Sequence, residues 1–249
     1  MPIDRHSPAP VVSPSETRAV VDWSLVTRRS VRAFRPDAVS MAQVESILEV
    51  ASFCASGMNI QPWKVHVVSG EAKTRLSDAI ARIDDDPAAG LDLDEPYQYY
   101  PRTWVPPYVD RRRKVGWDLY GLLGIRKGDK ERMHAQHGRN YRFFDAPVGL
   151  FFTLDRAMEV GSFIDCGMFL QAVMTAARGH GLHTCVQAAF LKYHRVIAAQ
   201  LGFPDDQMLV CGMSLGFADE DRIENALATE REPVSSFATF HHANKETST

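Results

Sequence analysis

Two short runs in the first quarter of the chain carry side chains that could bind an anion and a flat ring. The first, residues 28–32, reads Arg-Arg-Ser-Val-Arg. Guanidinium groups give forked, charge-assisted hydrogen bonds to phosphate oxygens, and a serine hydroxyl adds a neutral donor. The run therefore suits a phosphate monoester, although a solvated helix end would carry the same charges.

The second run, residues 55–63, reads Ala-Ser-Gly-Met-Asn-Ile-Gln-Pro-Trp. Its residues are small and polar, its end is marked by Pro and Trp, and its Asn and Gln present amide donors and acceptors. This composition favours a loop that lies flat against a ring. Neither run is specific alone, but the pair, about twenty-five residues apart, is.

The composition is that of a globular protein that is neither strongly basic nor strongly acidic. The 249 residues are enough for one large domain, and the net charge of −3 points neither to nucleic acid nor to an anionic membrane as a partner. No apolar run is long enough to predict a membrane span. The N-terminus lacks the basic start and apolar core of a signal peptide, so we expect a cytoplasmic protein.

Neither the cysteines nor the histidines predict a metal site. The four cysteines are Cys54, Cys166, Cys185 and Cys211. They form no Cys-x-x-Cys pair and lie among small or apolar neighbours, which is typical of buried free thiols. His134 and His137 are three residues apart but have no carboxylate or cysteine at ligand spacing, so we expect no metal.

Local patterns predict the elements that must position the two runs. Capping boxes beginning at Ser13 and Ser40 predict helices from Pro14 to about Thr27 and from Met41 onward. Apolar periodicity predicts further helices over 71–83, 108–123, 162–178 and 193–201, and strands over 64–68, 148–154, 182–187 and 208–217. Residues 1–12, rich in Pro and Ser, are expected to form a loose arm.

Three segments are less regular in sequence. Residues from about 84 to 140 are rich in aromatic side chains and proline, which is typical of a lid or binding loop leaving the core rather than of a separate domain. The helix over 162–178 is apolar on most sides, so it belongs to a core or a subunit interface. Residues 218–249 contain no second domain pattern and must be disordered or pack on something, for which a partner subunit is the natural candidate.

The order of motifs along the chain resembles the nitroreductase family. The motifs are the run 28–32, the loop 55–63, Asp-Ala-Pro at 145–147 before a strand, the apolar helix, Gly-Leu-His-Thr-Cys-Val-Gln at 181–187 and Thr-Glu-Arg-Glu-Pro at 229–233. The resemblance implies a single α+β domain over residues 1–249, with a central, mostly antiparallel sheet wrapped by helices. It also implies a homodimer that exchanges C-terminal arms and binds one FMN at each end of the interface.

The resemblance also assigns cofactor-binding residues. Those matching the FMN phosphate and ribityl contacts are Arg28, Arg29, Ser30 and Arg231. Arg32 matches the cation beside flavin N1 and O2, where charge-assisted hydrogen bonds would stabilise negative charge. The loop residues that would cover the ring from the other subunit are Ala55, Ser56, Gly57 and Asn59. The segment beside flavin N5 is matched by Gln187, Ala188 and Ala189. The pyrimidine edge is matched by Asn140 and Arg142.

Two positions depart from the family pattern. Many members have Pro where this chain has Ala55, which makes the loop less rigid. Members often have Glu-Gly where this chain has Ala188 and Ala189, and a backbone contact would survive that change.

The chain also lacks a Gly-x-Gly-x-x-Gly run after a strand, so it has no dedicated dinucleotide-binding domain. This fits an oxidoreductase in which NADH or NADPH and the oxidant take turns over one flavin face, with hydride passing through N5 and no catalytic side chain required. We expect nitroaromatic acceptors, including nitrobenzoate-like ones. The aromatic residues that could stack them are Tyr97, Tyr100, Trp104, Tyr108 and Tyr120. Ordinary packing would explain these aromatics equally well.

Two other readings of the sequence remain. The same fold could reduce quinones, enals or another acceptor. A protein that binds flavin without catalysis would also carry both runs, and steady consumption of NADH with an acceptor would exclude it.

Overall fold

The centre of the molecule is an antiparallel sheet. The computed structural model describes residues 12–86, 88 and 93–241, and within these ranges the sheet has four strands in the order β1-β2-β4-β3. Their bounds are Lys64–Ser69 for β1, Val148–Asp155 for β2, His183–Gln187 for β3 and Gln207–Gly216 for β4. Every neighbouring pair is antiparallel, which confirms the predicted sheet.

The two middle strands are the most buried part of the fold. Seven of the eight residues of β2 and nine of the ten residues of β4 are buried. A strand covered on both faces must be apolar on both sides of its pleat, which is why these segments appear in the sequence as nearly continuous apolar runs. One bulge, between Phe152 and Thr153, shifts the register of β2 on β4.

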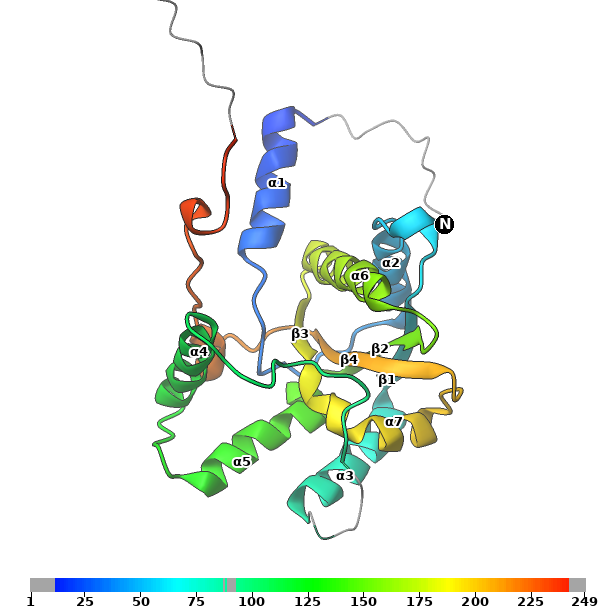
Figure 1. Ribbon diagram of the computed structural model, residues 1–249, viewed down its shortest axis with the longest axis vertical. Coiled ribbons are helices and arrows are strands. Elements are labelled where there is room, and N and C mark those ends of the chain that lie inside the picture. Colours follow the sequence, from blue (N-terminus) through cyan, green and yellow to red (C-terminus); the bar gives the residue numbers. More distant parts are fainter. Residues whose placement is uncertain (1–11, 87, 89–92, 242–249) are drawn as a thin grey trace, which may run out of the picture.

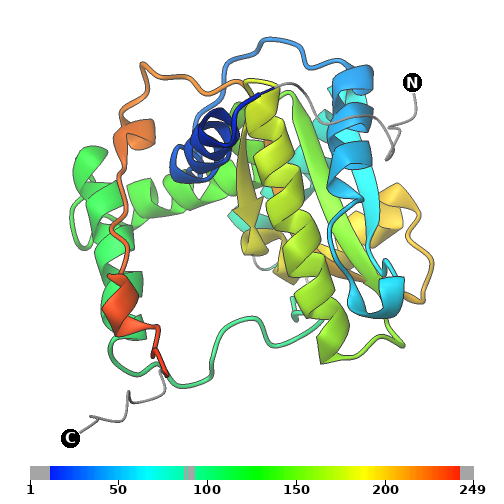
Figure 2. The same ribbon diagram turned by 90° about the horizontal axis from the view of Figure 1, so that it is seen from above.

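Helices cover both faces of the sheet (Figure 1). α2 (Met41–Ala51) and α6 (Val160–Gly179) share one core cluster with β2 and β4, and α3 (Gly70–Asp85) and α7 (His194–Leu201) share the other. Figure 2 shows α6 running along the sheet. The expected α+β architecture with helices around a central sheet is therefore confirmed.

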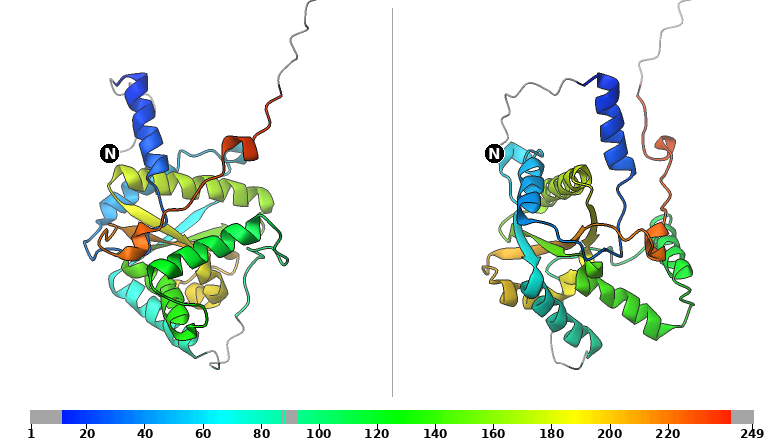
Figure 3. Two further views of the ribbon diagram at one scale, coloured as in Figure 1. Left: turned by 90° about the vertical axis from the view of Figure 1, so that its left-hand side faces the viewer. Right: turned by 180° about the vertical axis from the view of Figure 1, so that it is seen from behind.

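Both predicted capping boxes are present. The hydroxyl oxygen of Ser13 accepts the N–H of Glu16 at the start of α1 (Pro14–Val26), and Ser40 caps α2 in the same way with Gln43. Such caps depend on neighbouring residues only, which makes them visible in sequence. α1 nevertheless stands away from the body of the molecule (Figure 3), and its Val26 is 83% exposed.

α6 has the length and hydropathy of a membrane-spanning helix. One side of it, including Phe169 and Val173, is buried against the sheet, as in the core helix of a globular domain. The other side is open, with Ile164 65% exposed and Met168 37% exposed. The predicted core position is therefore confirmed for one face, whereas the predicted interface for the other face stays a prediction.

The aromatic-rich excursion returns to the sheet through helices. Its described part runs from residue 93 into α4 (Tyr108–Leu122), α5 (Lys130–Gly138) and the short helix η3 (Arg139–Asp145), which leads into β2. The hydroxyl of Tyr97 donates to the carbonyl of Val210, 2.6 Å away, and fixes the segment before α4 to β4.

The two ends of the chain lie outside the central sheet. Of the predicted loose arm 1–12, only Val12 is among the described residues. After β4 the chain forms η5 (Ile223–Ala226), runs beside α4 (Figure 2) and forms η6 (Val234–Ser236). An ion pair of 2.8 Å between Arg111 and Glu232 joins this tail to α4. Residues 242–249 of the predicted C-terminal arm are outside the described part.

Candidate functional site

The run 28–32 is held in place by its own backbone. Ser30 forms a parallel bridge with Thr184 of β3, and the N–H of Val31 donates to the carbonyl of Thr184 over 3.1 Å. One residue later, the N–H of Arg32 donates to Oδ1 of Asn225 over 2.8 Å. The run therefore lies between the first residues of β3 and the turn that follows β4, with its side chains set by buried neighbours.

The side chains at the start of the run are suited to an anion. Arg29 pairs with Glu220, and its Nε is buried without a hydrogen-bond partner among the described residues. Arg28 is half-buried, and Ser30 is exposed. A buried, unsatisfied guanidinium N–H next to an exposed hydroxyl is the arrangement that a phosphate would complete.

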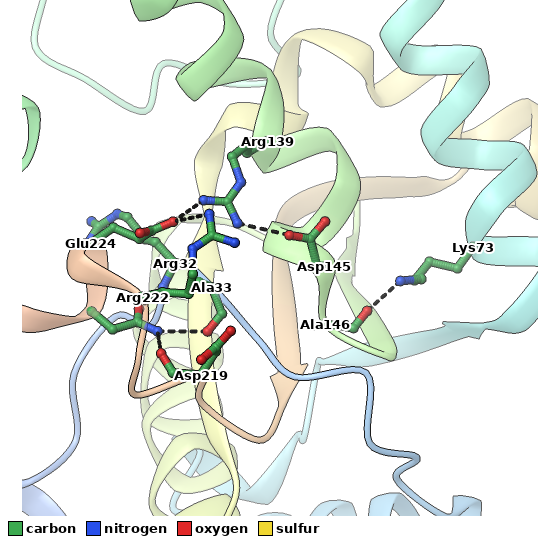
Figure 4. Close-up of polar contacts among 10 residues, drawn as sticks. Arg32, Ala33, Lys73, Arg139, Asp145, Ala146, Asp219, Arg222 and Glu224 are labelled. Carbon is green, nitrogen blue, oxygen red and sulfur yellow. Dashed lines mark hydrogen bonds and ion pairs between the residues drawn. The ribbon is translucent and has the colours of Figure 1, made fainter. Parts of the chain in front are cut away.

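A cluster of opposite charges lies beside Arg32 (Figure 4). Glu224, only 1% exposed, pairs with Arg139 and, at 2.9 Å, with Arg222. Burial acts to raise the pKa of Glu224, but its own backbone N–H and the two guanidinium groups outweigh burial and hold that pKa below its ordinary value. The carboxylate stays ionised and fixes this corner of the fold.

A cavity of about 550 Å³ opens next to Arg32. Its lining contains Arg32, Asn140, Gln187, Ala188 and Ala189. These five predicted residues come from the run 28–32, from η3, from the end of β3 and from the short helix η4 (Ala188–Tyr193). The structure thus brings together side chains that are more than 150 residues apart in sequence.

Gln187 locks the end of β3. Its side chain is 2% exposed, its Nε2 donates to the carbonyl of Asn140 over 2.7 Å, and its Oε1 accepts the hydroxyl of Ser214 over 2.7 Å. Both ends of the amide are therefore engaged in the interior. Gln187 fixes the backbone at which Ala188 and Ala189 line the cavity.

The aromatic excursion supplies the opposite wall of the cavity, but through only two of its five predicted aromatics. Tyr100 and Tyr120 line it. Tyr97 instead packs on Phe163 with its ring centroid 4.9 Å away. The rings of Trp104 and Tyr108 lie under the guanidinium groups of Arg112 and Arg111 at 4.9 and 5.9 Å. For these three residues, packing is the reading that the structure favours.

Two predicted cofactor residues lie elsewhere in the chain. Arg142 pairs with Asp78 of α3 at 3.2 Å and is not among the residues that line the cavity, so within one chain it does not join Asn140 there. Arg231 lies beside α4 and donates to the carbonyl of Thr229, away from Arg28 within one chain.

The loop 55–63 packs at the beginning of α6, away from the run 28–32. The N–H of Gly57 donates to Asp165 over 3.0 Å, and Trp63 stacks on Phe169 with the ring centroids 4.5 Å apart. Met58 has a left-handed backbone with φ of 48° and is 99% exposed. Within one chain the predicted loop residues therefore do not meet Arg28–Arg32.

Sequence reasoning missed five polar or reactive residues that line the cavity, which are Glu95, Gln136, His137, Cys185 and Lys192. For His137 a signal existed, because it precedes Tyr141 by four residues and so shares a helix face with it. Burial raises the pKa of the Cys185 thiol, which keeps it protonated. Within residues 12–86, 88 and 93–241, no group of three or more His, Cys, Asp or Glu could hold a metal ion.

Known sequences identify the lineage of this chain. The model of the nitroreductase family matches residues 25–217. A nitrobenzene nitroreductase of Ectopseudomonas oleovorans is 39% identical over 91% of this chain and 99% of the relative. A 4-nitrobenzoate reductase of Pseudomonas putida is 39% identical over 88% of this chain and 94% of the relative.

Solved structures agree with the sequences. An FMN- and NADPH-dependent nitroreductase from sphigopyxis sp. strain HMH has a TM-score of 0.84 and 36% identity, covering 90% of this chain and 99% of its own. An FMN-dependent nitroreductase from Mycobacterium smegmatis, solved in complex with NADPH, has a TM-score of 0.85 and 28% identity, covering 91% and 100%. The motifs, the antiparallel sheet and these likenesses agree, and the chain belongs to the nitroreductase family.

Proposed function

We propose that this protein is an FMN-dependent oxidoreductase that uses NADH or NADPH to reduce nitroaromatic compounds. The observation that carries the proposal is the cavity in which Arg32, Asn140 and the backbone of residues 187–189 face one another, next to Arg28–Ser30. A cation, an amide and a fixed stretch of backbone are the groups that bind the edge of a flavin ring, and the neighbouring arginines suit its phosphate.

The residues present fit FMN. The buried Nε of Arg29, unsatisfied among the described residues, calls for an acceptor such as a phosphate oxygen. Arg28 and Ser30 stand beside it in sequence, and Arg32 lies in the cavity. The group would therefore be held by its phosphate at Arg28–Ser30 and by its ring next to Arg32, Asn140 and Ala188.

FMN, when bound, supplies the transfer of two electrons and a hydride between a nicotinamide and an acceptor. The chain's own residues bind and orient. A cation such as Arg32 stabilises negative charge next to it, by about 1.5–3 kcal/mol for a hydrogen bond to a charged group. The locked amide of Gln187 holds the backbone under the ring, and Tyr100 and Tyr120 border the space that remains for a second aromatic ring.

The acceptor class is proposed from two relatives whose names specify nitrobenzene and 4-nitrobenzoate. Two structural relatives are described as NADPH-dependent or as bound to NADPH, so we propose NADPH as the first reductant to test. All four cysteines are free thiols. Free thiols favour a reducing compartment, which supports a cytoplasmic location.

We propose further that the active protein is a homodimer. Large apolar side chains are exposed on both α6 and α1, including Ile164 at 65% and Val26 at 83%, and exposed apolar patches often mark protein–protein contacts. Pairing two copies through this surface would let the loop 55–59 of one protomer approach the cavity of its partner. It would also give the tail bearing Arg231 a second chain on which to pack.

A spectrum of the purified protein tests the proposal. We expect a bound flavin that NADPH bleaches under anaerobic conditions and that regains its colour when 4-nitrobenzoate is added to the same cuvette. A protein that neither carries nor takes up FMN would contradict the cofactor assignment. Flavin that bleaches but does not recover with the nitro compound would contradict the acceptor.

A further inference from the structure

A path of polar groups runs from the cavity into the interior. Nδ1 of His137 lies 3.4 Å from the hydroxyl of Tyr141. The rings of Tyr141 and Tyr193 pack edge to face with their centroids 4.9 Å apart, and the interaction of their hydroxyls affects the pKa of both phenols. Tyr193 in turn donates to Oδ1 of Asp84 over 2.6 Å. The four residues come from α5, η3, η4 and α3, so four elements converge to make a single path.

The path is buried except at its ends. Tyr141 and Tyr193 are 0% and 1% exposed, and the side chain of Asp84 is 7% exposed. Burial raises the pKa of both phenols, which therefore stay protonated. Burial also acts to raise the pKa of Asp84, but hydrogen bonds from Lys192 and Tyr193 outweigh it and keep the carboxylate ionised.

The ionised end sets the direction of every hydrogen bond in the path. An ionised carboxylate can only accept hydrogen bonds. The hydroxyl of Tyr193 therefore donates to Asp84, and the hydroxyl of Tyr141 donates to Tyr193. The oxygen of Tyr141 is then an acceptor for His137, which must carry its proton on Nδ1. Because the ring of His137 lines the cavity while Nδ1 faces Tyr141, Nε2 is the nitrogen left for a ligand.

Nitro reduction needs a proton at this place. Each two-electron step takes up one: ArNO₂ + NAD(P)H + H⁺ gives ArNO + NAD(P)⁺ + H₂O, and ArNO + NAD(P)H + H⁺ gives ArNHOH + NAD(P)⁺. In the first step one N–O bond breaks, and its oxygen leaves as water. Two other cations line the cavity, Arg32 and Lys192. Arg32 does not release protons, because a guanidinium remains charged in proteins, and the ammonium group of Lys192 is engaged by the carboxylate of Asp84 at 2.8 Å.

We propose that His137 donates this proton from Nε2 to the nitro or nitroso group, and that Tyr141, Tyr193 and Asp84 are positioning residues that hold its ring and tautomer. The inference rests on the proposed nitroreductase function and goes beyond it, because that function requires no catalytic side chain. A carboxylate that orients an imidazole through intervening groups does what the aspartate does directly in hydrolase triads.

The surroundings of His137 give the proposal a pH signature. Desolvation lowers the pKa of His137 below its ordinary value of 6.5, as do the charges of Lys192 and His134, while Asp84 opposes them. Arg32 and Glu95 also line the cavity. The donor is the protonated imidazole, so oxidation by a nitro compound should be fastest at acidic pH and should slow as pH rises through this lowered pKa. Bleaching of the flavin by NADPH consumes no proton, so its rate should not fall as pH rises through the same range.

Stopped-flow measurements on FMN-loaded variants test the assignment. We expect His137→Gln to slow colour recovery with 4-nitrobenzoate by about a hundredfold, the usual effect of losing a general acid, and to abolish the pH limb. Tyr141→Phe, which removes one hydroxyl, should slow recovery about tenfold, and the double variant should be no slower than His137→Gln. Bleaching by NADPH, and recovery with ferricyanide, which takes electrons without protons, should be unchanged.

Two controls make the result decisive. Tyr99→Phe removes a hydroxyl outside the path and should leave recovery unchanged. Nitrogen-15 NMR of the imidazole should show the proton on Nδ1 in the unaltered protein and a loss of that preference in Tyr141→Phe, whether or not FMN is bound. Wild-type recovery rates in His137→Gln, or equal slowing of bleaching and recovery, would overturn the inference. An unaltered protein that never recovers colour would instead refute the proposed function.

Discussion

The run 28–32 and the loop 55–61 are both predicted to bind the same cofactor, yet the fold treats them differently. Val31 and Arg32 are tied by backbone N–H groups to a strand carbonyl and to Asn225, which is 4% exposed. In the loop, Met58, Asn59 and Gln61 all have left-handed backbone angles, and Met58 is 99% exposed.

The run 28–32 is thus fixed by contacts within one chain, whereas the loop 55–61 is exposed to solvent. Left-handed residues other than glycine cost free energy and persist only where the surrounding structure imposes them. Here Asp165 and the stacked pair of Trp63 and Phe169 impose them. The loop is exposed to solvent beside the open face of α6, which supports the proposal that a second copy of the chain packs there.

The largest effect is expected from a charge on the open face of α6. Ile164→Asp would bury an unpaired carboxylate in the proposed interface, which costs several kcal/mol per ion. We expect a monomer by light scattering and a protein that has lost its FMN, because both halves of the site are needed. Val105→Asp, at a position that is 53% exposed in the excursion, is the control. An Ile164→Asp dimer with full flavin content would show that the loop does not act across subunits.

The second largest effect is expected from removing a cation from the run 28–32, whose contacts all lie within one chain. Arg28→Ala should weaken FMN binding by about 1.5–3 kcal/mol, which is roughly ten- to a hundredfold, because a charge-assisted hydrogen bond to phosphate disappears. Fluorescence titration of the apoprotein with FMN measures the change. Arg35→Ala, which removes an exposed arginine paired with Asp37, is the matched control. Equal affinities in the two variants would remove Arg28 from the phosphate site.

A smaller effect is expected from a substitution in β4 where this strand packs against η4. A Cβ at Gly212 of β4 would overlap the ring of Phe190, which follows Ala188 and Ala189 in η4. Gly212→Ala should therefore lower the free energy of unfolding by about 1–3 kcal/mol through overpacking. Thermal unfolding measures this, with Gly116→Ala as the control, because a Cβ there meets open space. An unchanged melting temperature would mean that η4 can shift freely, contrary to a prebuilt half-site.

The smallest effect concerns the strain in the loop. Met58→Gly relieves a left-handed residue at a cost in chain entropy, so we expect stability to change by less than about 1 kcal/mol. The useful measurement is FMN affinity in the dimer, which should fall as the loop loses its fixed shape. Unaltered affinity would indicate that this part of the loop does not contribute to the proposed site.

Much of the fold was predictable because its signals are local. The capping boxes at Ser13 and Ser40 involve residues three apart, and the strands Val148–Asp155 and Gln207–Gly216 show their burial as apolar runs. That Arg32 and Gln187 line one cavity could be predicted only from the family resemblance, because no local pattern in the sequence relates residues so far apart.

The rest depended on packing that no local pattern encodes. Arg142 pairs with Asp78 of α3 instead of lining the cavity, and a contact between residues 64 apart leaves no local signal in the sequence. Of the aromatic residues in the excursion, Tyr100 faces the cavity and Tyr97 faces the core, although their spacing and composition are alike. His137 was weighed only as a metal ligand, because the cavity that it lines is made of residues from several distant elements.

The single hydrogen bond from Tyr97 to the carbonyl of Val210 has a practical consequence for protein engineering. It anchors one end of a segment whose following residues reach the cavity without belonging to the core. Libraries that keep Tyr97 and vary residues 98–107 can thus explore new acceptors without risking the sheet.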